Sequence, residues 1–341
     1  MAITFPRNYP TSMRVVGMSF MLQPHAMLAP TRGGTEYAAE LGDTRWRASY
    51  DSPPLTEDQV DEWSAWYSTL LSYETFWGYD LRREYPKAYP NGWGSMTVGG
   101  VPFNGYAAIN TITEGGKVVQ LINCPSGFIM SVGDYIAFDY GQSGGRALHR
   151  LVTAAVGPSP IFEVRPVITY PGVNTNMLVN PSFGTAEPND DWVQGAGWTI
   201  PAGGFAIGTN VAANVNLSQS VGNVAGSGLT VPLVEGQFYR VQWSISAITS
   251  GSLRISLGGN VGTERNTVAT FNEVIQAGSD PRLFVVPITA PFNGSLSQVN
   301  LFPAASLYKP AAKMVIMPDT YVEPIDILKM GKIKFEAIQV L

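Results

Sequence analysis

The order of apolar and polar positions changes twice along the chain. Between Gly133 and Ile168, short apolar runs alternate with turns that contain glycine. This pattern stops at Pro171-Gly172, where a second pattern of short alternating runs begins. The first pattern returns only at Ala305. One segment of the chain therefore interrupts another.

The interruption predicts an inserted domain. Surface loops bury little backbone and tolerate insertions, so a small domain can lie within a loop of a larger one. We predict a discontinuous scaffold domain of residues 1–172 and 305–341, and an inserted domain of residues 174–303. The run over residues 332–341 is typical of a closing strand. This organisation favours a scaffold that displays a module over a single enzyme core.

The scaffold domain reads as many short strands. Alternation of apolar and polar residues, the period of a half-buried strand, extends from Thr44 to Tyr50. Gly141-Gln-Ser-Gly-Gly145 is typical of a hairpin tip. Further strands are expected as a pair within residues 14–28 and near residues 96–101, 106–112 and 117–122. Together they predict a β-sandwich or barrel scaffold.

One helix is predicted, directly after Pro53-Pro54. Thr56 is a candidate N-cap, acidic residues follow it in the first turn, and Gln59 completes a capping-box spacing. Apolar residues then recur at helical spacing, at Val60, Trp63, Tyr67, Leu70 and Leu71. Trp63 and Trp66 are interpreted as core or subunit-interface packing residues, because aromatic side chains bury the largest area.

The inserted domain also reads as short strands separated by turns. In the run from Phe238 to Trp243, Tyr239, Val241 and Trp243 fall on one face, and Arg240 and Gln242 fall on the other. Strands of this length and spacing predict a jelly-roll sandwich. The overall fold class is therefore mainly β with one main helix.

Composition adds a constraint on the surface. Apolar residues make up 45% of the chain, but charged residues make up only 14%. Soluble proteins usually carry about 25% charged residues. Either the β surfaces are built from uncharged polar residues, or an assembly hides part of them, since interface centres are depleted of charge. Both explanations stay open.

Several classes of protein are disfavoured. The net charge is −5 and the basic residues are scattered, so no nucleic-acid-binding stripe is expected. The single cysteine, Cys124, excludes an internal disulfide and a cysteine-based zinc site, and it is predicted to be a buried apolar residue. We find no secretory signal, and no apolar run approaches the ~20 residues that span a bilayer. The chain is therefore expected to be made in a cytosol without membrane insertion.

The scaffold segments resemble a phage protein family. Trp46-Arg-Ala-Ser-Tyr, a helix after Pro53-Pro54-Leu55, and then an aromatic strand are similar to tail proteins of long-tailed phages. The later pair Gly133-Asp-Tyr-Ile-Ala-Phe and Leu148-His-Arg-Leu-Val, and Phe335-Glu-Ala near the end, are similar too. The scaffold segments specifically resemble a distal tail protein. The resemblance implies a virion protein that forms a ring, a hexamer in that family, between the tail tube and the tip. Its partners would be tube, hub and fibre proteins.

The insert resembles carbohydrate-binding modules of the galactose-binding-like type. The resemblance rests on the order Asn180-Pro-Ser-Phe, two tryptophans, Leu217-Ser-Gln-Ser-Val and Gly236-Gln-Phe-Tyr. It implies a host surface glycan as ligand. Trp192 and Trp198 are candidates for the aromatic face that stacks on a sugar ring, with Gln219 for its hydroxyl groups. The alternative is that Trp198 lies in the core and Trp192 at its rim, since tryptophan is usually buried.

The same resemblance suggests a metal site in the insert. Such modules often hold a structural calcium, but Gly184 stands where an acidic residue is common. Asn189, Asp190 and Asp191 offer oxygen atoms nearby, the ligands that calcium prefers. A short acidic run in a loop is otherwise simply solvated. Calcium therefore remains a candidate cofactor.

Catalytic motifs are not found in the sequence. His25 and His149 are the only histidines, and no nucleophile elbow, phosphate loop or zinc-protease motif is present. We expect that the chain is not an enzyme. Two other functions stay open: a bacterial carbohydrate-binding or adhesive accessory protein, and a glycoside hydrolase with two distant carboxylates.

Overall fold

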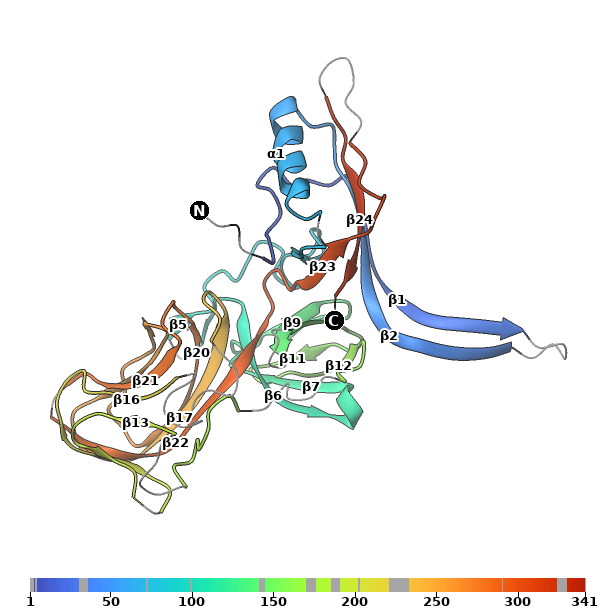
Figure 1. Ribbon diagram of the computed structural model, residues 1–341. Coiled ribbons are helices and arrows are strands. Elements are labelled where there is room, and N and C mark those ends of the chain that lie inside the picture. Colours follow the sequence, from blue (N-terminus) through green and yellow to red (C-terminus); the bar gives the residue numbers. More distant parts are fainter. Residues whose placement is uncertain are drawn as a thin grey trace.

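The computed structural model describes residues 3, 5–30, 36–71, 73–98, 100–140, 145–169, 176–184, 191–201, 203–220, 233–289, 291–323 and 330–340. Among these residues the fold is mainly β with the single α-helix α1 (Glu57–Ser68) and the short 3₁₀ turn η1 (Glu114–Gly116), which confirms the predicted fold class (Figure 1). No helix in the described part of the chain is long and apolar enough to cross a bilayer.

The first sheet joins residues from both ends of the chain. Strand β24 (Lys334–Gln339) pairs antiparallel with the end of β2 (Glu36–Asp51), with Lys334 opposite Asp51. The full order is β1 (Gly17–Pro30), β2, β24, β23 (Ala312–Ile316) and β3 (Phe76–Gly78). Residues that flank the insert on both sides therefore share one sheet.

Helix α1 packs beside this sheet, and its start agrees with the sequence prediction. Oε1 of Gln59 accepts a hydrogen bond from the backbone N–H of Thr56 at 3.0 Å, as a capping box requires. The predicted apolar stripe differs at its end, because Leu71 lies beyond the helix and is 62% exposed. The buried helical residues are Val60, Trp63 and Trp66.

A two-stranded arm extends from the first sheet. Only the end of β2 pairs with β24, so the remaining length of β1 and β2 forms a ribbon of these two strands alone. Figure 1 shows this arm, in blue, reaching away from the rest of the molecule. The strand pair expected within residues 14–28 is wrong: from Gly17 onward that segment lies in the one strand β1, paired to β2.

The second sheet spans the scaffold and the insert. In the scaffold it contains β6 (Tyr106–Thr113), β7 (Val118–Ile122), β12 (Ile161–Arg165), β10 (Gly145–Leu151) and β9 (Tyr135–Tyr140). In the insert it contains β14 (Trp198–Thr199), β15 (Ala206–Val211), β17 (Phe238–Ser250) and β20 (Ala269–Gln276). Strands β6 and β7 match the predictions for 106–112 and 117–122. Strands β9 and β10 form the predicted hairpin, whose tip, residues 141–144, lies outside the described residues.

One strand connects the two halves of this sheet. Strand β22 (Phe292–Ser306) pairs with β15 and β17 in the insert and then with β6 from Ala304 to Ser306. The sequence placed the end of the insert between residues 303 and 305. In the structure this position lies inside a continuous strand, because each part of β22 finds a partner strand on its own side.

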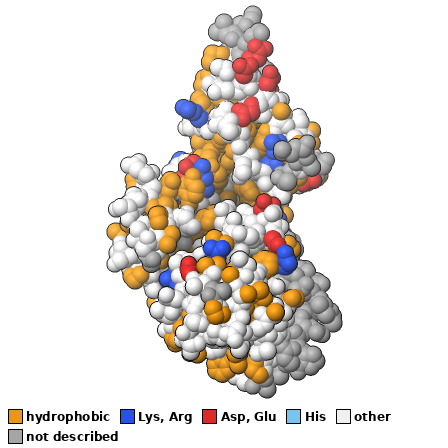
Figure 2. Space-filling view, turned by 90° about the vertical axis from the view of Figure 1, so that its left-hand side faces the viewer, with side chains coloured by type: hydrophobic (Ala, Val, Ile, Leu, Met, Phe, Trp, Pro, Cys, Tyr) orange, Lys and Arg blue, Asp and Glu red, His pale blue; other side chains and the backbone are white. Residues whose placement is uncertain are grey.

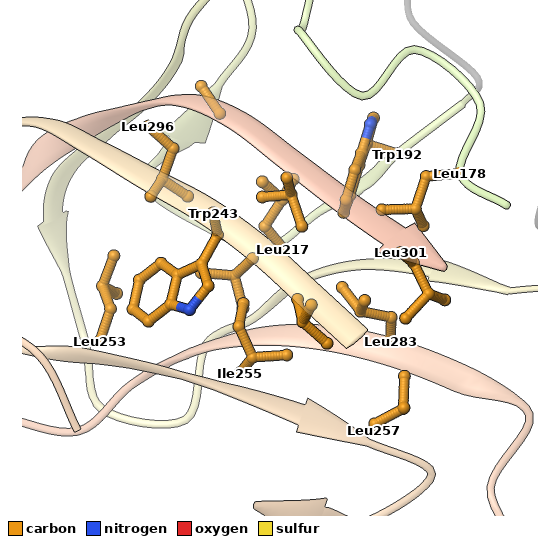
Figure 3. Close-up of a cluster of buried hydrophobic side chains, with 14 of the residues drawn as sticks. Leu178, Trp192, Leu217, Trp243, Leu253, Ile255, Leu257, Leu283, Leu296 and Leu301 are labelled. Atoms are coloured by element: carbon orange, nitrogen blue, oxygen red, sulfur yellow. The ribbon is translucent and has the colours of Figure 1, made fainter. Parts of the chain in front are cut away.

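The insert is completed by a third sheet. Its order is β13 (Val193–Gln194), β16 (Leu217–Ser220), β21 (Arg282–Pro287), β18 (Leu253–Leu257) and β19 (Asn260–Val261). Apolar side chains from this sheet meet those of β17 and β22, and Figure 3 shows Leu217 and Ile255 near Trp243 and Leu283 near Leu301. The two facing sheets enclose one core, as in a β-sandwich.

The scaffold contains two further buried clusters. One lies between the first sheet and α1, and the other lies among β6, β7, β9, β10 and β12. Cys124 belongs to the second cluster and is 4% exposed, which confirms its predicted burial, and this burial raises the pKa of its thiol to about 12. Two short strand pairs flank that cluster: the hairpin of β4 (Thr97–Val98) with β5 (Val101–Pro102), and β8 (Ile129–Met130) with β11 (Ala155–Val156). The single strand expected over 96–101 is therefore a hairpin.

The surface carries few charges. On the face shown in Figure 2, apolar and uncharged polar side chains cover most of the area, and Lys, Arg, Asp and Glu are scattered among them. Large apolar side chains are exposed in several places, including the arm. The low charged fraction of the sequence is thus visible on this face of the molecule.

Candidate functional site

Trp192 and Trp198 lie in the insert core. Their exposed fractions are 2% and 4%, and Figure 3 shows Trp192 beside Leu178 within the apolar cluster. Nε1 of Trp192 donates to the carbonyl oxygen of Asn180 at 3.1 Å, and Nε1 of Trp198 donates to that of Val215 at 2.9 Å. Because neither ring presents a face to solvent, the prediction of a sugar-stacking platform at these residues is corrected: both are core residues.

Gln219 is likewise a structural residue. Its side chain is fully buried, and Nε2 donates to the carbonyl oxygens of Val179 at 2.9 Å and Asp191 at 2.7 Å. Its Oε1 accepts from the backbone N–H of Val179 at 2.9 Å. The amide therefore ties two loops to β16, and no polar atom remains for a sugar hydroxyl. This corrects the expected ligand-binding role.

The structure describes only part of the predicted calcium site. Asn189 and Asp190 lie outside the described residues, whereas Asp191 is described and half-buried. No group of at least three His, Cys, Asp or Glu residues in the described part could hold a metal ion. The structural calcium stays a prediction from the sequence.

Trp63 and Trp66 pack within the scaffold. They are 1% and 3% exposed, and their rings meet edge to face with centroids 5.4 Å apart. Both also lie within 6.0 Å of the Phe335 ring on β24, and Nε1 of Trp66 donates to the carbonyl oxygen of Asn8 at 2.9 Å. These contacts attach α1 to the first sheet. A role in subunit contacts stays a prediction.

A cavity between the scaffold and the insert is the best candidate for a ligand site. This junction pocket has a volume of about 620 Å³, within the range of roughly 300–1,000 Å³ that ligand sites occupy. Scaffold residues near β4 and β6 form one wall, and residues of β19, β20 and the segment between them form the other. At its edge the rings of Tyr106 and Phe238 stack 3.6 Å apart across the boundary.

The walls of the junction pocket carry unused polar atoms. Among the described residues, Nδ2 of Asn123, Nε of Arg265 and Oδ1 of Asn272 are buried without a hydrogen-bond partner, and all three residues line the pocket. Buried polar groups without partners are rare in folded proteins, because each costs free energy. Two donors and one acceptor of pocket-lining residues are thus unsatisfied within the fold, and these atoms are shielded from solvent in this conformation.

Asn272 ends a row of amide side chains on the outer face of the insert sheet. Gln242 on β17 lies between Asn272 on β20 and Asn300 on β22. Nδ2 of Asn300 donates to Oε1 of Gln242 at 3.1 Å, and Nδ2 of Asn176 donates to Oδ1 of Asn300 at 2.7 Å. Alternation in the sequence predicted that Gln242 faces outward, but it gave no signal for the partner strands.

Glu273, the next residue on β20, points to the opposite face of the strand, and its carboxylate accepts hydrogen bonds there. Its Oε1 accepts from Nε1 of Trp243 at 3.0 Å, and its Oε2 accepts from the backbone N–H of Thr263 at 2.9 Å. Burial raises the pKa of this carboxyl group above its ordinary value. The pocket wall therefore combines neutral amides, one guanidinium and a largely occupied carboxylate, a set suited to an uncharged ligand rich in hydroxyl groups.

A second cavity of about 620 Å³ is a weaker candidate. It lies at the contact between the first sheet and the insert and contains Arg146, which is 8% exposed. The Arg146 guanidinium is already engaged, donating to Asp139 at 3.0 Å and to the carbonyl oxygen of Ala311 at 3.2 Å. Its planar face also lies 5.2 Å from the Trp77 ring. The Arg146 guanidinium in this cavity is thus already hydrogen-bonded within the protein, whereas the junction pocket is lined by residues with unpaired polar atoms.

Comparison with known proteins gives no family. No family model matches the chain, and no curated protein matches it. Among solved structures, it is similar to the N-terminal CBM22 tandem domain of Paenibacillus barcinonensis Xyn10C at 10% identity and a TM-score of 0.11. That alignment covers 94% of this chain and 92% of the other. So low a TM-score supports no argument about fold or ligand.

Proposed function

We propose that this chain is a structural protein of a phage tail, a distal tail protein that assembles into a ring between tail tube and tip. The proposal rests on the sequence resemblance of residues 1–172 and 305–341, and one structural observation supports it above the others. This observation is the arm of β1 and β2. Tube, hub and fibre proteins are its proposed neighbours.

The arm has the properties of a subunit contact. An isolated two-stranded ribbon is marginally stable in water, and its outer edges carry unpaired backbone groups that can join another chain. At about 3.3 Å per residue, a strand as long as β1 is suited to reaching a neighbouring protomer. Met27 and Leu41 on the arm are 57% and 58% exposed, so their apolar surface is available for burial.

Measuring the mass of the purified full chain tests this proposal. Light scattering at micromolar concentration should give a multiple of the chain mass. The double variant Met27→Glu/Leu41→Glu should shift the protein toward a monomer, because burying two added carboxylates in a contact is unfavourable. Val268→Glu/Leu71→Glu is the matched control, with exposed fractions of 59% and 62% away from the arm. A monomeric wild-type protein, or equal masses for both variants, contradicts the proposal.

A second function, binding of a surface glycan, is supported by the junction pocket. The unpaired polar atoms of Asn123, Arg265 and Asn272 match the needs of a neutral polyhydroxyl ligand. The insert would then contact host glycans through its boundary with the scaffold. This site replaces the corrected residues Trp192, Trp198 and Gln219.

A glycan array probed with the full chain tests the second function. We expect Asn272→Ala to weaken any binding at least about tenfold, the loss typical of a hydrogen bond in a desolvated site. Thr270→Ala, an exposed position two residues away on the same strand and outside the pocket, should bind as the wild type does. Absence of binding, or equal loss in both variants, rejects this role without affecting the ring proposal.

A further inference from the structure

Three cationic side chains converge on one glycine in the scaffold. Gly133 lies in the turn before β9 and has φ +87°, a backbone conformation that glycine adopts readily. A Cβ atom built on it would lie 3.0 Å from Nη1 of Arg83, 3.1 Å from Nζ of Lys87 and 3.2 Å from Nη2 of Arg150. We call Arg83, Lys87 and Arg150 the Gly133 cluster. Their nitrogen atoms therefore lie close together against the backbone of Gly133, where a side chain would crowd them.

The cluster is only partly neutralised by its surroundings: the Asp134 carboxylate attracts the charges of Lys87 and Arg83. In the described part of the chain, no ion pair of 4.0 Å or less joins these three side chains to a carboxylate. Asp134 follows Gly133 directly, but its carboxylate accepts from the backbone N–H groups of Lys87 at 2.9 Å and Ser131 at 2.7 Å. Asp80 and Glu84, the other acids in this loop, are paired with Arg82 at 2.9 Å and with Lys309 at 3.5 Å.

Most of the donors in the cluster are unused. Arg83 donates through Nη1 to the carbonyl oxygen of Gly133, and Lys87 donates through Nζ to that of Val132. A guanidinium offers five N–H donors and an ammonium three. No hydrogen bond from the Arg150 guanidinium to another described residue is found, and Arg150 is exposed. Positive charge and free donors therefore point to the same place.

The cluster is held in position by regular structure. Arg150 lies on β10 opposite Tyr135 of β9, and the Gly133 N–H donates to the carbonyl oxygen of Leu151 at 2.8 Å. The guanidinium of Arg83 lies 5.9 Å from the centre of the Tyr135 ring. The hydrogen bond from Lys87 N–H to Asp134 fixes the loop that supplies both Arg83 and Lys87. The backbone that carries the three side chains is therefore already ordered before an anion binds.

From this geometry we propose that the Gly133 cluster binds a tetrahedral oxyanion, a phosphoryl or sulfuryl group. Like charges this close repel one another, and an anion between them removes the repulsion while accepting charge-assisted hydrogen bonds. Donors that approach from three residues fit an ion with three accessible oxygens better than a planar carboxylate, which presents two. The cluster is also isolated on a chain of net charge −5, which favours a single group over a nucleic-acid backbone. The proposal is independent of the ring assignment.

Calorimetric titration of the full chain tests this proposal, with inorganic phosphate, sulfate or acetate at constant ionic strength in chloride. Phosphate and sulfate should bind one per chain, and acetate at least about tenfold more weakly. Arg150→Gln and Lys87→Gln should each weaken phosphate binding about tenfold. Lys117→Gln, the same change at an exposed residue elsewhere, should have no effect.

A parallel titration with glycerol 3-phosphate and a glycerophosphodiester distinguishes the source of the group. Binding of both indicates a site open to phosphate within a polymer, whereas binding of the monoester alone indicates a terminal phosphate. Both results support the oxyanion site. Absence of phosphate and sulfate binding, or phosphate affinity unchanged in Arg150→Gln and Lys87→Gln proteins that melt like the wild type, overturns it.

Discussion

At the scale of single residues, the two tryptophans of the insert show how one side chain fits two interpretations. An indole has a flat apolar face and one N–H donor, which suit a sugar platform and a core equally well. The deciding contacts are the carbonyl oxygens of Asn180 and Val215, which satisfy the N–H groups inside the fold. These acceptors lie in loops, and no period in the sequence predicts their positions.

Trp192→Ala should therefore lower stability. Replacing a buried tryptophan by alanine typically costs about 3–5 kcal/mol of unfolding free energy, because transfer energy is lost and a cavity forms. Denaturant unfolding of the full chain measures this. Trp192→Phe should lose less, since only the hydrogen bond to Asn180 and part of the packing disappear. An unchanged unfolding midpoint for Trp192→Ala would contradict the core assignment.

His149 makes stability depend on pH. It is fully buried, its Nδ1 lies 2.8 Å from the carbonyl oxygen of Pro166, and burial lowers its pKa from 6.5 to about 4. The unfolded chain therefore takes up the proton first as the pH falls. The stabilising contribution is complete above pH 6.5 and is lost progressively down to about pH 4, by about 3 kcal/mol in total.

The variant His149→Phe isolates this effect. Its ring should keep the stacking on Phe138, whose centroid lies 5.2 Å away, but it cannot be protonated. We expect the free energy of unfolding of the variant to fall less steeply than that of the wild type between pH 6.5 and pH 4. Parallel curves for the two proteins would assign the acid sensitivity to other groups.

At the scale of elements, α1 was predictable because its signals are local. The cap, the acidic first turn and the apolar spacing all lie within one stretch of sequence. Gln59→Ala should cost about 0.5–1 kcal/mol, since the N–H of Thr56 loses its partner. Gln59→Glu keeps an acceptor there and should be close to the wild type. Thermal unfolding followed by circular dichroism compares them, and equal losses would show that the cap contributes nothing.

The arm was not predictable from local signals. Segment 14–28 contains Pro24, and proline lacks the N–H that a central strand donates. The structure places Pro24 inside β1, at a shift of register between Gln23 opposite Arg45 and His25 opposite Gly42. Bulges and edge strands tolerate proline and bend the ribbon. A bulge and a turn look alike in sequence until the partner strand is known.

At the scale of the whole molecule, the features that the sequence did not predict are those formed by residues far apart in the chain. The predicted boundary after residue 303 follows a change in pattern, yet β22 runs through it because β6, far earlier in the chain, pairs with Ala304 and Ala305. The Gly133 cluster and the junction pocket also combine residues far apart in sequence. The sequence thus predicted the type of fold and one helix, but not these sites.

Continuity of β22 predicts that insert and scaffold move together. Ala305→Pro removes a backbone donor in a strand that pairs on both sides, which should loosen the connection without removing either core. Small-angle X-ray scattering should then show a larger maximum dimension than in the wild type. Ala305→Gly keeps the donor and is the control. Unchanged scattering from the proline variant would mean that other contacts hold the two parts together.

The same strand also determines how a mechanical load would travel. Antiparallel hydrogen bonds lie perpendicular to the strand, so tension along β22 shears its bonds to β15, β17 and β6 all at once. Peeling them one after another would need far less force. Force applied to the insert is consequently transmitted to the scaffold along β22. Under tension, we expect the first rupture at another place in the chain.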